Sequence, residues 1–423
     1  MNILVIGNGF DLAHGLPTKY TDFLEFVKII NSINELNIIN DSNRLNEVIC
    51  ENQKMNPEIK LMITKKFEKT VLDKDTKELL YLIEKNFWID YFLQNPIYLK
   101  ENWIDFENEI SRIIQSLDKD MHCNKRYELD DIVENLSNKF LYKRYSNNSN
   151  VLSDSRKSIK KIVGSNTFRI IRDDLLIDLN RLIRALEIYM VEYVGKMDCK
   201  FESPDIREIY PSNVISFNYT NTYERFYDEG DIPTYDYIHG KINNEGTVET
   251  NNMVLGIDEY LPDDRKNKDI EFIAFKKYYQ RVHKQTGCEY KNWVDEIKTD
   301  YNIFLEFREV SKRENLKKFV NGDKEVQVYQ GTFKTHRLYI FGHSLDVADG
   351  DVLKDLILND KVWTTIYYLN KEIMGQQIAN LVKVIGQEEL IKRTGGNNKR
   401  IEFKLQQNMV ENTSVKRIYS KLL

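Results

Sequence analysis

The sequence predicts an α/β protein with a Rossmann-type parallel sheet flanked by helices and interrupted by large helical insertions. Ile3–Ile6 is an unbroken aliphatic run, typical of a strand buried on both faces of a parallel sheet. Short apolar runs return from Val214 onward, and polar or glycine residues follow them. The long segment between these regions is polar with helical spacing. Strand–helix alternation at both ends of the chain favours one sheet domain built from distant segments.

Each element rests on its own pattern. Apolar residues at helical spacing predict helices, and short apolar runs before polar or glycine residues predict strands. The expected helices are Tyr20–Ile30, Thr76–Asn95, Phe106–Leu117, Asp130–Tyr142, Arg169–Val194, Gly350–Leu358 and Lys371–Val384, with a further helical stretch over Lys266–Val320. The later strands are expected at Val214–Phe217, Thr234–Ile238, Met253–Leu255, Val326–Tyr329, Arg337–Phe341, Thr364–Leu369 and Ile401–Leu405. The polar stretch Ser146–Ser158 is expected to be a loop.

These elements predict a division of the chain into three parts. The nucleotide-binding α/β domain is expected to combine residues 1–30, 201–260 and 325–423. Residues 31–200 and 261–324 are then two helical insertions. No internal repeat is visible in the sequence.

Composition excludes several classes of protein. With 61 basic and 66 acidic residues, the net charge of −5 argues against nucleic-acid binding by bulk electrostatics. The four cysteines, at positions 50, 123, 199 and 288, form no C-x-x-C pair, so we expect reduced thiols and no zinc site. No run approaches the ~18 apolar residues that span a bilayer. The first strand begins at residue 2, so we expect no signal peptide, no membrane association and a cytoplasmic location.

Four segments at predicted strand ends carry the candidate chemistry: Gly7–Asp11, Ser216–Thr222, His239–Lys241 and Gly342–Asp346. In an open parallel sheet, the carboxyl ends of the strands gather at one edge, where ligands bind. We therefore expect residues far apart in the chain to meet in one crevice.

The first of these segments suggests a phosphate cradle. Gly7 and Gly9 allow a tight turn and close approach of a ligand to the backbone, and a helix follows at once. The third glycine of the dinucleotide fingerprint is missing, because Leu12 stands in its place. An ordinary tight turn between strand and helix remains the alternative. His14, on the following helix, could contact phosphate or face solvent.

The other segments offer polar side chains with competing interpretations. Asn218 supplies an amide donor and acceptor directly after a strand, although it and Asn221 could instead cap the next helix. His239 could act as a general base or orient a ligand hydroxyl, or it could be structural. Gly342 allows close approach and Ser344 supplies a hydroxyl. The spacing around that serine does not fit the nucleophile elbow of serine hydrolases.

Two further groups allow a different chemistry. Asp105 and Glu107 follow an aromatic residue, but side chains two positions apart on a helix do not face each other. A helix cap at Asp105 is therefore the better interpretation than a metal pair. The basic residues Lys276, Lys277 and Arg281 could clamp phosphate or nucleic acid, or form a solvated helix face.

Several blocks resemble the bacteriophage abortive infection AbiH family. They are residues 7–18 (GNGFDLAHGLPT), 215–224 (ISFNYTNTYE), 238–241 (IHGK) and 341–346 (FGHSLD). Together they extend over most of the chain. The resemblance implies a role in antiphage defence.

The same blocks are similar to the sirtuin-type NAD-binding fold, in which Gly-Ala-Gly-x-Ser-x-x-x-Gly-Ile-Pro binds the dinucleotide. Asp11 replaces the serine of that motif. A carboxylate near phosphate is repulsive unless it caps an amide or holds a metal. The resemblance implies a cofactor-binding set of Gly7, Asn8, Gly9, Phe10, Asp11, Gly15, Pro17, Gly342 and Ser344.

The resemblance further implies that Asn218 and His239 act on the ribose at the nicotinamide end of NAD. A zinc ribbon with paired C-x-x-C motifs is missing, so a protein deacetylase is not expected. The leading hypothesis is an antiphage enzyme that hydrolyses NAD or a related nucleotide, without a metal, when a phage-encoded trigger or a defence partner activates it. A homo-oligomer is a further possibility.

Two alternatives stay open. The first is a non-catalytic protein that senses a nucleotide or serves as a scaffold, with the helical insertions as its working surface. The second is a metal-dependent nuclease that uses Asp105, Glu107 and the basic helix near Arg281.

Overall fold

The computed structural model describes residues 1–101, 104–122, 138–147, 166–228, 233–300, 305, 309 and 336–412. Internal contacts group the chain into two compact units. The sheet unit comprises Met1–Gly15, Cys199–Ile238 and Thr286–Leu423, and the helical unit comprises Leu16–Asp198 and His239–Gln285. The three-part division expected from the sequence stays a prediction.

The sheet unit contains a six-stranded parallel sheet with the order β4-β3-β1-β5-β6-β7. Its strands are β1 (Asn2–Ile6), β3 (Asn213–Ser216), β4 (Thr234–Tyr237), β5 (His336–Phe341), β6 (Val362–Tyr368) and β7 (Ile401–Leu405). Counted along the chain within this sheet, the order is 3-2-1-4-5-6, which is that of Rossmann-type dinucleotide-binding folds. The direction of winding reverses between β1 and β5. The predicted α/β class with a Rossmann-type parallel sheet is confirmed, whereas the similarity to the sirtuin-type fold stays a prediction.

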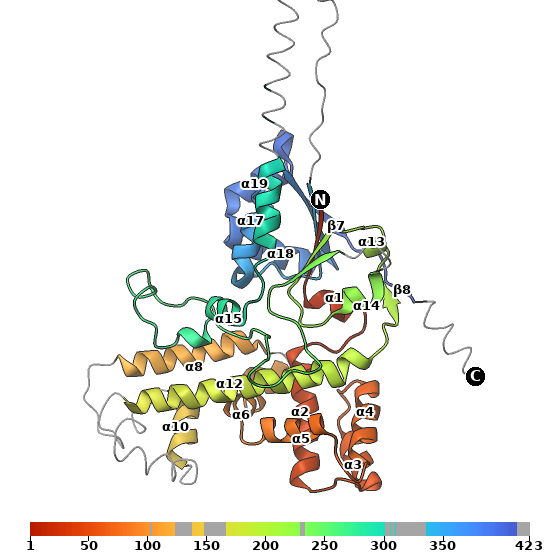
Figure 1. Ribbon diagram of the computed structural model, residues 1–423, viewed down its shortest axis with the longest axis vertical. Helices are drawn as coiled ribbons and strands as arrows, with labels where there is room; N and C mark the ends of the chain where they lie inside the picture. The colour runs from red at the N-terminus through yellow and green to blue at the C-terminus, as the bar shows by residue number, and fades with distance from the viewer. Residues whose placement is uncertain are drawn as a thin grey trace, which may run out of the picture. The chain divides into compact units, whose positions relative to one another are not determined.

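Helices cover both faces of this sheet (Figure 1). Ile3 and Val5 point into a core shared with α17 (Gly350–Ile357), α18 (Lys371–Ile385), α19 (Gln387–Thr394) and the helix over 290–300. Leu4 and Ile6 point into the opposite core, shared with α1 (Asn8–Ala13), α13 (Pro204–Arg207) and α14 (Thr222–Tyr227). Because β1 is buried on both faces, its sequence is a continuous apolar run rather than an alternating one.

The helices of the sheet unit are mostly short. In the described part of this unit they include, besides the helix over 290–300, α1 (Asn8–Ala13), α13 (Pro204–Arg207), α14 (Thr222–Tyr227), α17 (Gly350–Ile357), α18 (Lys371–Ile385) and α19 (Gln387–Thr394), with 3-10 turns η3 (Val347–Asp349) and η4 (Gly396–Asn398). A small antiparallel pair, β2 (Phe201–Glu202) and β8 (Val410–Glu411), completes the unit.

The helical unit is organised around α12 (Asn166–Glu192), which packs against α5 (Lys74–Ile83) and α6 (Phe87–Leu93). Its other helices are α2 (Tyr20–Glu35), α3 (Ser42–Glu51), α4 (Pro57–Phe67), α5 (Lys74–Ile83), α6 (Phe87–Leu93), α7 (Pro96–Glu101), α8 (Phe106–Met121), α10 (Lys139–Asn147) and α15 (Lys277–Lys284), with 3-10 turns η1 (Val194–Lys196) and η2 (Ile273–Phe275). Within the described ranges, no helix is long and apolar enough to cross a membrane.

One predicted helix is divided in two. The segment Thr76–Asn95 breaks between α5 and α6, where Lys85 adopts a left-handed φ of 53°. Asn86 then caps α6, since its side-chain oxygen accepts hydrogen bonds from the amides of Trp88 and Ile89. The sequence did not reveal this break, because the apolar residues keep their helical spacing on both sides of Asn86.

Other expectations fail, or lie outside the described residues. Met253–Leu255 is buried, but it joins no sheet. In the expected helical stretch, residues 266–272 contain turns rather than α-helix. The strand expected at Val326–Tyr329 lies outside the described residues, as do residues 130–137 of one expected helix and 148–158 of the expected loop.

Candidate functional site

Three of the four predicted strand-end segments meet at the carboxyl edge of the sheet unit. They follow β1, β3 and β5, which are adjacent strands. In the register, Ile6 lies beside both Ser216 and Phe341, so the three chains leave the sheet at the same level. This edge includes the point between β1 and β5 where the winding reverses, the usual ligand position in open α/β sheets.

The glycines bring two of these turns into direct backbone contact. The Gly9 amide donates a 2.8 Å hydrogen bond to the Gly342 carbonyl. A Cβ at Gly9 would lie 2.8 Å from the Gly342 Cα, and a Cβ at Gly342 would lie 2.1 Å from the Phe10 nitrogen. Gly342 also has a φ of 67°, which favours glycine. Packing between the turns therefore requires these glycines, and the Gly9 amide is bonded within the fold.

Asn218 connects the end of β3 to the glycine turn. Its Nδ2 donates to the Gly7 carbonyl at 3.0 Å, and its own amide donates to Ser216 Oγ at 3.1 Å. The N-cap of α14 is Asn221, whose side chain makes no capping hydrogen bond. Both asparagines were possible caps, and neither side chain performs that role for α14. Asn218 instead fixes one strand-end loop against another.

Asp11 is a buried carboxyl at this edge with a strongly raised pKa. Its side chain is 1% exposed, and burial raises its pKa to about 6, while Thr220, Thr222, Asn218 and Arg225 act to lower it. The Thr220 hydroxyl donates to Oδ2 at 2.6 Å. Among the described residues, Oδ1 is buried without a hydrogen-bond partner. A buried carboxyl that is only half satisfied is costly, so its presence requires an explanation.

His14 is a structural residue inside the sheet unit. It is 1% exposed, so the expectation that it could face solvent is wrong. Its Nδ1 lies 2.6 Å from the Phe10 carbonyl, and its Nε2 lies 2.6 Å from the Tyr227 hydroxyl, which accepts from the Ser203 amide. A neutral ring with its proton on Nδ1 satisfies all of these partners. Burial lowers the His14 pKa to about 4, which keeps the ring neutral.

The segment after β5 contains a buried histidine that the sequence interpretation passed over. His343 Nδ1 accepts from the Leu345 amide at 2.9 Å, so Nε2 carries the proton and faces Asp349 Oδ2 at 3.3 Å. The ring packs edge-on against Phe217. Ser344 is exposed, and its carbonyl accepts from Asn380. The sequence did contain a signal for this residue, because His343 lies within the predicted strand-end segment Gly342–Asp346.

Two predicted site residues belong to the helical unit. His239 is the first residue of the second segment of this unit, His239–Gln285, and it is buried. Its carbonyl accepts a 2.8 Å hydrogen bond from the Val254 amide. The carbonyl of Pro17 accepts a 2.8 Å hydrogen bond from Tyr189 on α12. Gly15, with a φ of 80°, follows the end of α1 in the sheet unit.

A family model for bacteriophage abortive infection AbiH matches residues 3–368, which include all four strand-end segments. The chain belongs to the AbiH family. No curated protein and no solved structure matches it. Family membership supports a role in phage abortive infection.

Asn8 and Phe10 complete the predicted cofactor-binding set of this AbiH protein. Asn8 is exposed at the start of α1. Phe10 is fully buried and contacts His14, Tyr227 and Phe341. Its side chain therefore belongs to the core beneath the edge. The binding role assigned to the whole set stays a prediction.

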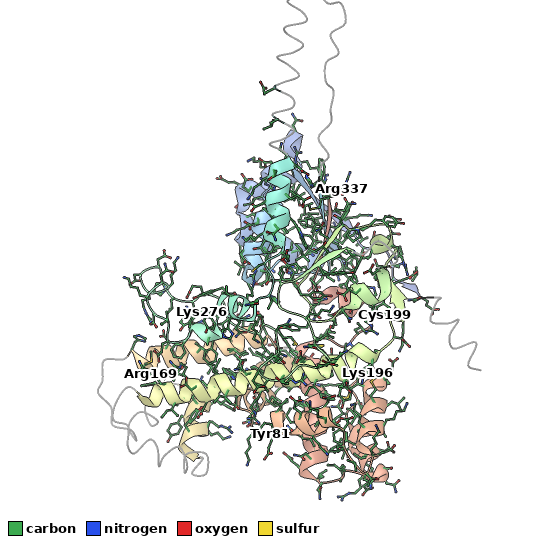
Figure 2. All side chains as sticks on the ribbon, viewed as in Figure 1. Tyr81, Arg169, Lys196, Cys199, Lys276 and Arg337 are labelled. Atoms are coloured by element: carbon green, nitrogen blue, oxygen red, sulfur yellow. The ribbon has the colours of Figure 1, made fainter. Side chains whose placement is uncertain are left out.

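Asp105, Glu107 and the two lysines predicted for a nuclease form hydrogen bonds or ion pairs within the helical unit. Asp105 caps α8 by accepting from the Asn108 amide, as expected for a helix start. Glu107 pairs with Lys277 at 2.6 Å. Lys276, labelled in Figure 2, is 1% exposed and pairs with both oxygens of Glu259 at 2.8 Å. These two lysines therefore do not form a solvated helix face.

Proposed function

We propose that this AbiH protein binds NAD or a related nucleotide at the carboxyl edge of its sheet and hydrolyses it in the cytoplasm during phage infection. The observation that carries the proposal is the 3-2-1-4-5-6 strand order, together with the meeting of the loops after β1, β3 and β5 at the reversal point. This is the position at which folds with this strand order bind dinucleotides.

The proposed reaction breaks the bond between C1′ of the ribose and the nicotinamide nitrogen. Nicotinamide leaves with the bonding electron pair, and water adds to C1′, which yields ADP-ribose and one proton. The transition state resembles an oxocarbenium ion, so groups that orient the ribose and its hydroxyls lower the barrier. We assign this role to Asn218 and His239. His239 is also the candidate base that takes the proton from water.

Continuous hydrolysis of NAD would harm the host, so the activity must be restrained before infection. We propose that a phage-encoded trigger, a defence partner protein or assembly into a homo-oligomer releases it. No metal is assigned to the reaction.

The test follows nicotinamide release from NAD by the purified full-length protein, with and without lysate from phage-infected cells. Release that requires the trigger supports the proposal. His239→Ala and Asn218→Ala should each abolish release and cell toxicity while circular dichroism stays unchanged. A folded double variant that keeps its toxicity, or wild type that neither binds NAD nor releases nicotinamide under any trigger, contradicts the proposal.

A specific observation favours a second candidate, a nucleotide sensor without chemistry. The side-chain amide of Asn218 and the backbone amide of Gly9 both donate to backbone carbonyls of the protein itself. These two donors are therefore used within the fold rather than directed at a substrate, as expected for a pocket that binds a nucleotide without reacting with it. NAD-dependent thermal stabilisation without nicotinamide release would favour the sensor. Release under any trigger would exclude it.

A further inference from the structure

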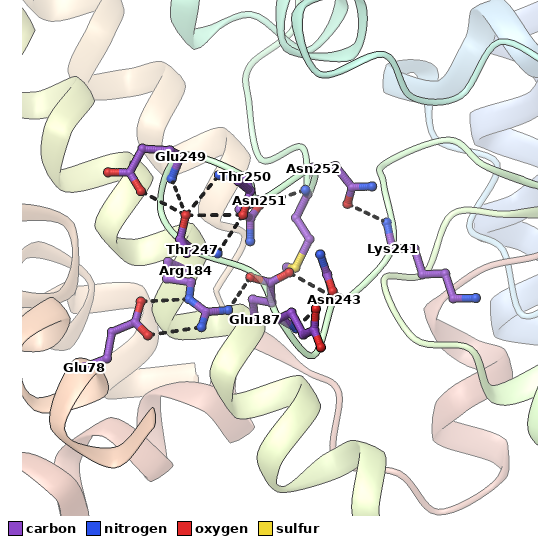
Figure 3. Close-up of polar contacts among 12 residues, drawn as sticks. Glu78, Arg184, Glu187, Lys241, Asn243, Thr247, Glu249, Thr250, Asn251 and Asn252 are labelled. Atoms are coloured by element: carbon purple, nitrogen blue, oxygen red, sulfur yellow. Dashed lines mark hydrogen bonds and ion pairs between the residues drawn. The ribbon is translucent and has the colours of Figure 1, made fainter. Parts of the chain in front are cut away.

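The helical unit contains a buried ion-pair cluster beneath the loop that follows His239. Arg184 on α12 contacts both oxygens of Glu78, at 2.9 and 3.1 Å, and pairs with Glu187 at 2.6 Å (Figure 3). The side chain of Glu187 is fully buried and that of Arg184 is 4% exposed. Ionised groups are seldom buried this deeply unless they are paired, as they are here.

Glu187 extends this cluster to the backbone of residues 240–253, which we call the His239 loop. Its Oε1 accepts the Asn243 amide at 3.0 Å (Figure 3). The loop also lies directly over the carboxylate at Gly246, where a Cβ would be 2.6 Å from Glu187 Oε2. One carboxylate thus binds the arginine with one oxygen and the loop with the other.

The two ends of the His239 loop are held close together. Val254, just after the loop, donates its amide to the His239 carbonyl at 2.8 Å. The Lys241 amide donates to Asn252 Oδ1 at 3.1 Å (Figure 3). Gly240 has a φ of 77°, and a Cβ there would lie 2.1 Å from the Asn252 carbonyl oxygen. The position of the His239 backbone therefore depends on the course of the loop.

Lys284 at the end of α15 secures the far end of the loop. Its ammonium donates to the carbonyl of Met253. Burial lowers the Lys284 pKa to about 8, whereas the negative charge of Glu187 raises it. Glu187 therefore fixes the loop directly at Asn243 and favours the charged lysine that fixes it at Met253.

Stability alone is a weak reason for such a cluster. Replacing a buried ion pair by packed apolar side chains is often neutral or stabilising, whereas an ion pair sets geometry through directional bonds. Here those bonds end on the loop that directly follows His239.

We propose that Glu187, oriented by Arg184, is a positioning residue that fixes the His239 loop and thereby the placement of His239 for the reaction. The inference rests on the proposed function, in which His239 contacts the ribose or the attacking water. Glu187 itself contacts neither. Its effect passes through the Asn243 amide and the loop backbone.

The experiment compares Glu187→Gln with Glu192→Gln in the full chain. Glu192 is a matched control, since it lies on the same helix and pairs with Lys66 and Lys196 at 2.7 Å. Hydrogen exchange of amides 239–254 should rise about tenfold in Glu187→Gln and stay unchanged in the control. Gly246→Ala tests the same contact from the loop side if Glu187→Gln does not fold.

The rate of turnover distinguishes a positioning role of Glu187 from a purely structural one, because a purely structural role would leave kcat unchanged in a folded variant. Glu187→Gln should lower kcat about 100-fold with KM nearly unchanged, because a small misplacement of a reacting group slows chemistry without weakening binding. Glu187→Asp should restore part of the rate. Unchanged exchange in residues 239–254, or faster exchange with normal kcat, overturns the inference. Wild type without turnover instead refutes the proposed function, while the exchange comparison still decides whether Glu187 fixes the loop.

Discussion

Replacing Asp11 by asparagine should stabilise the sheet unit at neutral pH. Burial raises the Asp11 pKa from its ordinary value of 3.8 to about 6. The protonated form is therefore favoured on folding, and this contribution is fully present below pH 3.8 and lost as the pH rises through 6. A shift of about 2 pKa units corresponds to about 3 kcal/mol for a fully buried group. Asparagine keeps an acceptor for the Thr220 hydroxyl and carries no charge.

The free energy of unfolding of Asp11→Asn should therefore exceed that of wild type by up to about 3 kcal/mol at pH 7.5, with the difference vanishing near pH 4. This difference in the free energy of unfolding is measured by urea denaturation, with hydrogen exchange of peptides from β1 and β3 as the probe of unfolding. Asp205→Asn is the matched control, since Asp205 is equally buried but accepts hydrogen bonds from Gln407 and pairs with Lys404. The control should lose stability. A destabilised Asp11→Asn, or a gain that does not vary with pH, would refute the desolvation argument.

Three further substitutions, one of them with a glycine control, test individual contacts by urea denaturation. Tyr227→Phe should cost about 1–3 kcal/mol, because the buried Nε2 of His14 loses its partner; full stability would show that the bond contributes nothing. Gly342→Ala should prevent folding of the sheet unit, since the new Cβ meets backbone at 2.1 Å, whereas Gly375→Ala, with no heavy atom within 4 Å, should gain up to about 1 kcal/mol. Asp105→Ala should cost about 1 kcal/mol through its lost helix cap. An unchanged urea midpoint would contradict that role.

The sheet was predictable because its signals are local. Ile3–Ile6 and Leu338–Phe341 are largely apolar runs that are followed by glycine, and each lies within a strand, β1 or β5. Met253–Leu255 has the same local pattern but forms no strand, because the amide and carbonyl of Leu255 bond to the Gln280 side chain instead of a neighbouring strand. That choice depends on a helix more than 20 residues away, which a strand pattern does not encode.

The meeting of three strand-end segments was predictable, but the chemistry of their side chains was not. The rule that strand ends converge correctly brought the Asn218 and Gly342 segments to the Gly7 turn. The purpose of the glycines was not visible, because a glycine that admits a ligand and one that admits another backbone have the same sequence signal. The burial of Asp11 was equally hidden, since a polar residue at the start of a helix normally suggests exposure or a cap.

The contact between the two glycine turns constrains how a nucleotide would bind. The Gly9 amide could donate to a phosphate only after its 2.8 Å bond to the Gly342 carbonyl breaks. The buried carboxyl of Asp11 in the same turn would repel that phosphate whenever it is ionised. Hydroxyl groups suffer neither penalty, because a ribose hydroxyl can donate to a carboxylate. If a nucleotide binds at this edge as proposed, its ribose rather than its pyrophosphate would lie near Asp11 and Asn218, as cleavage at C1′ requires.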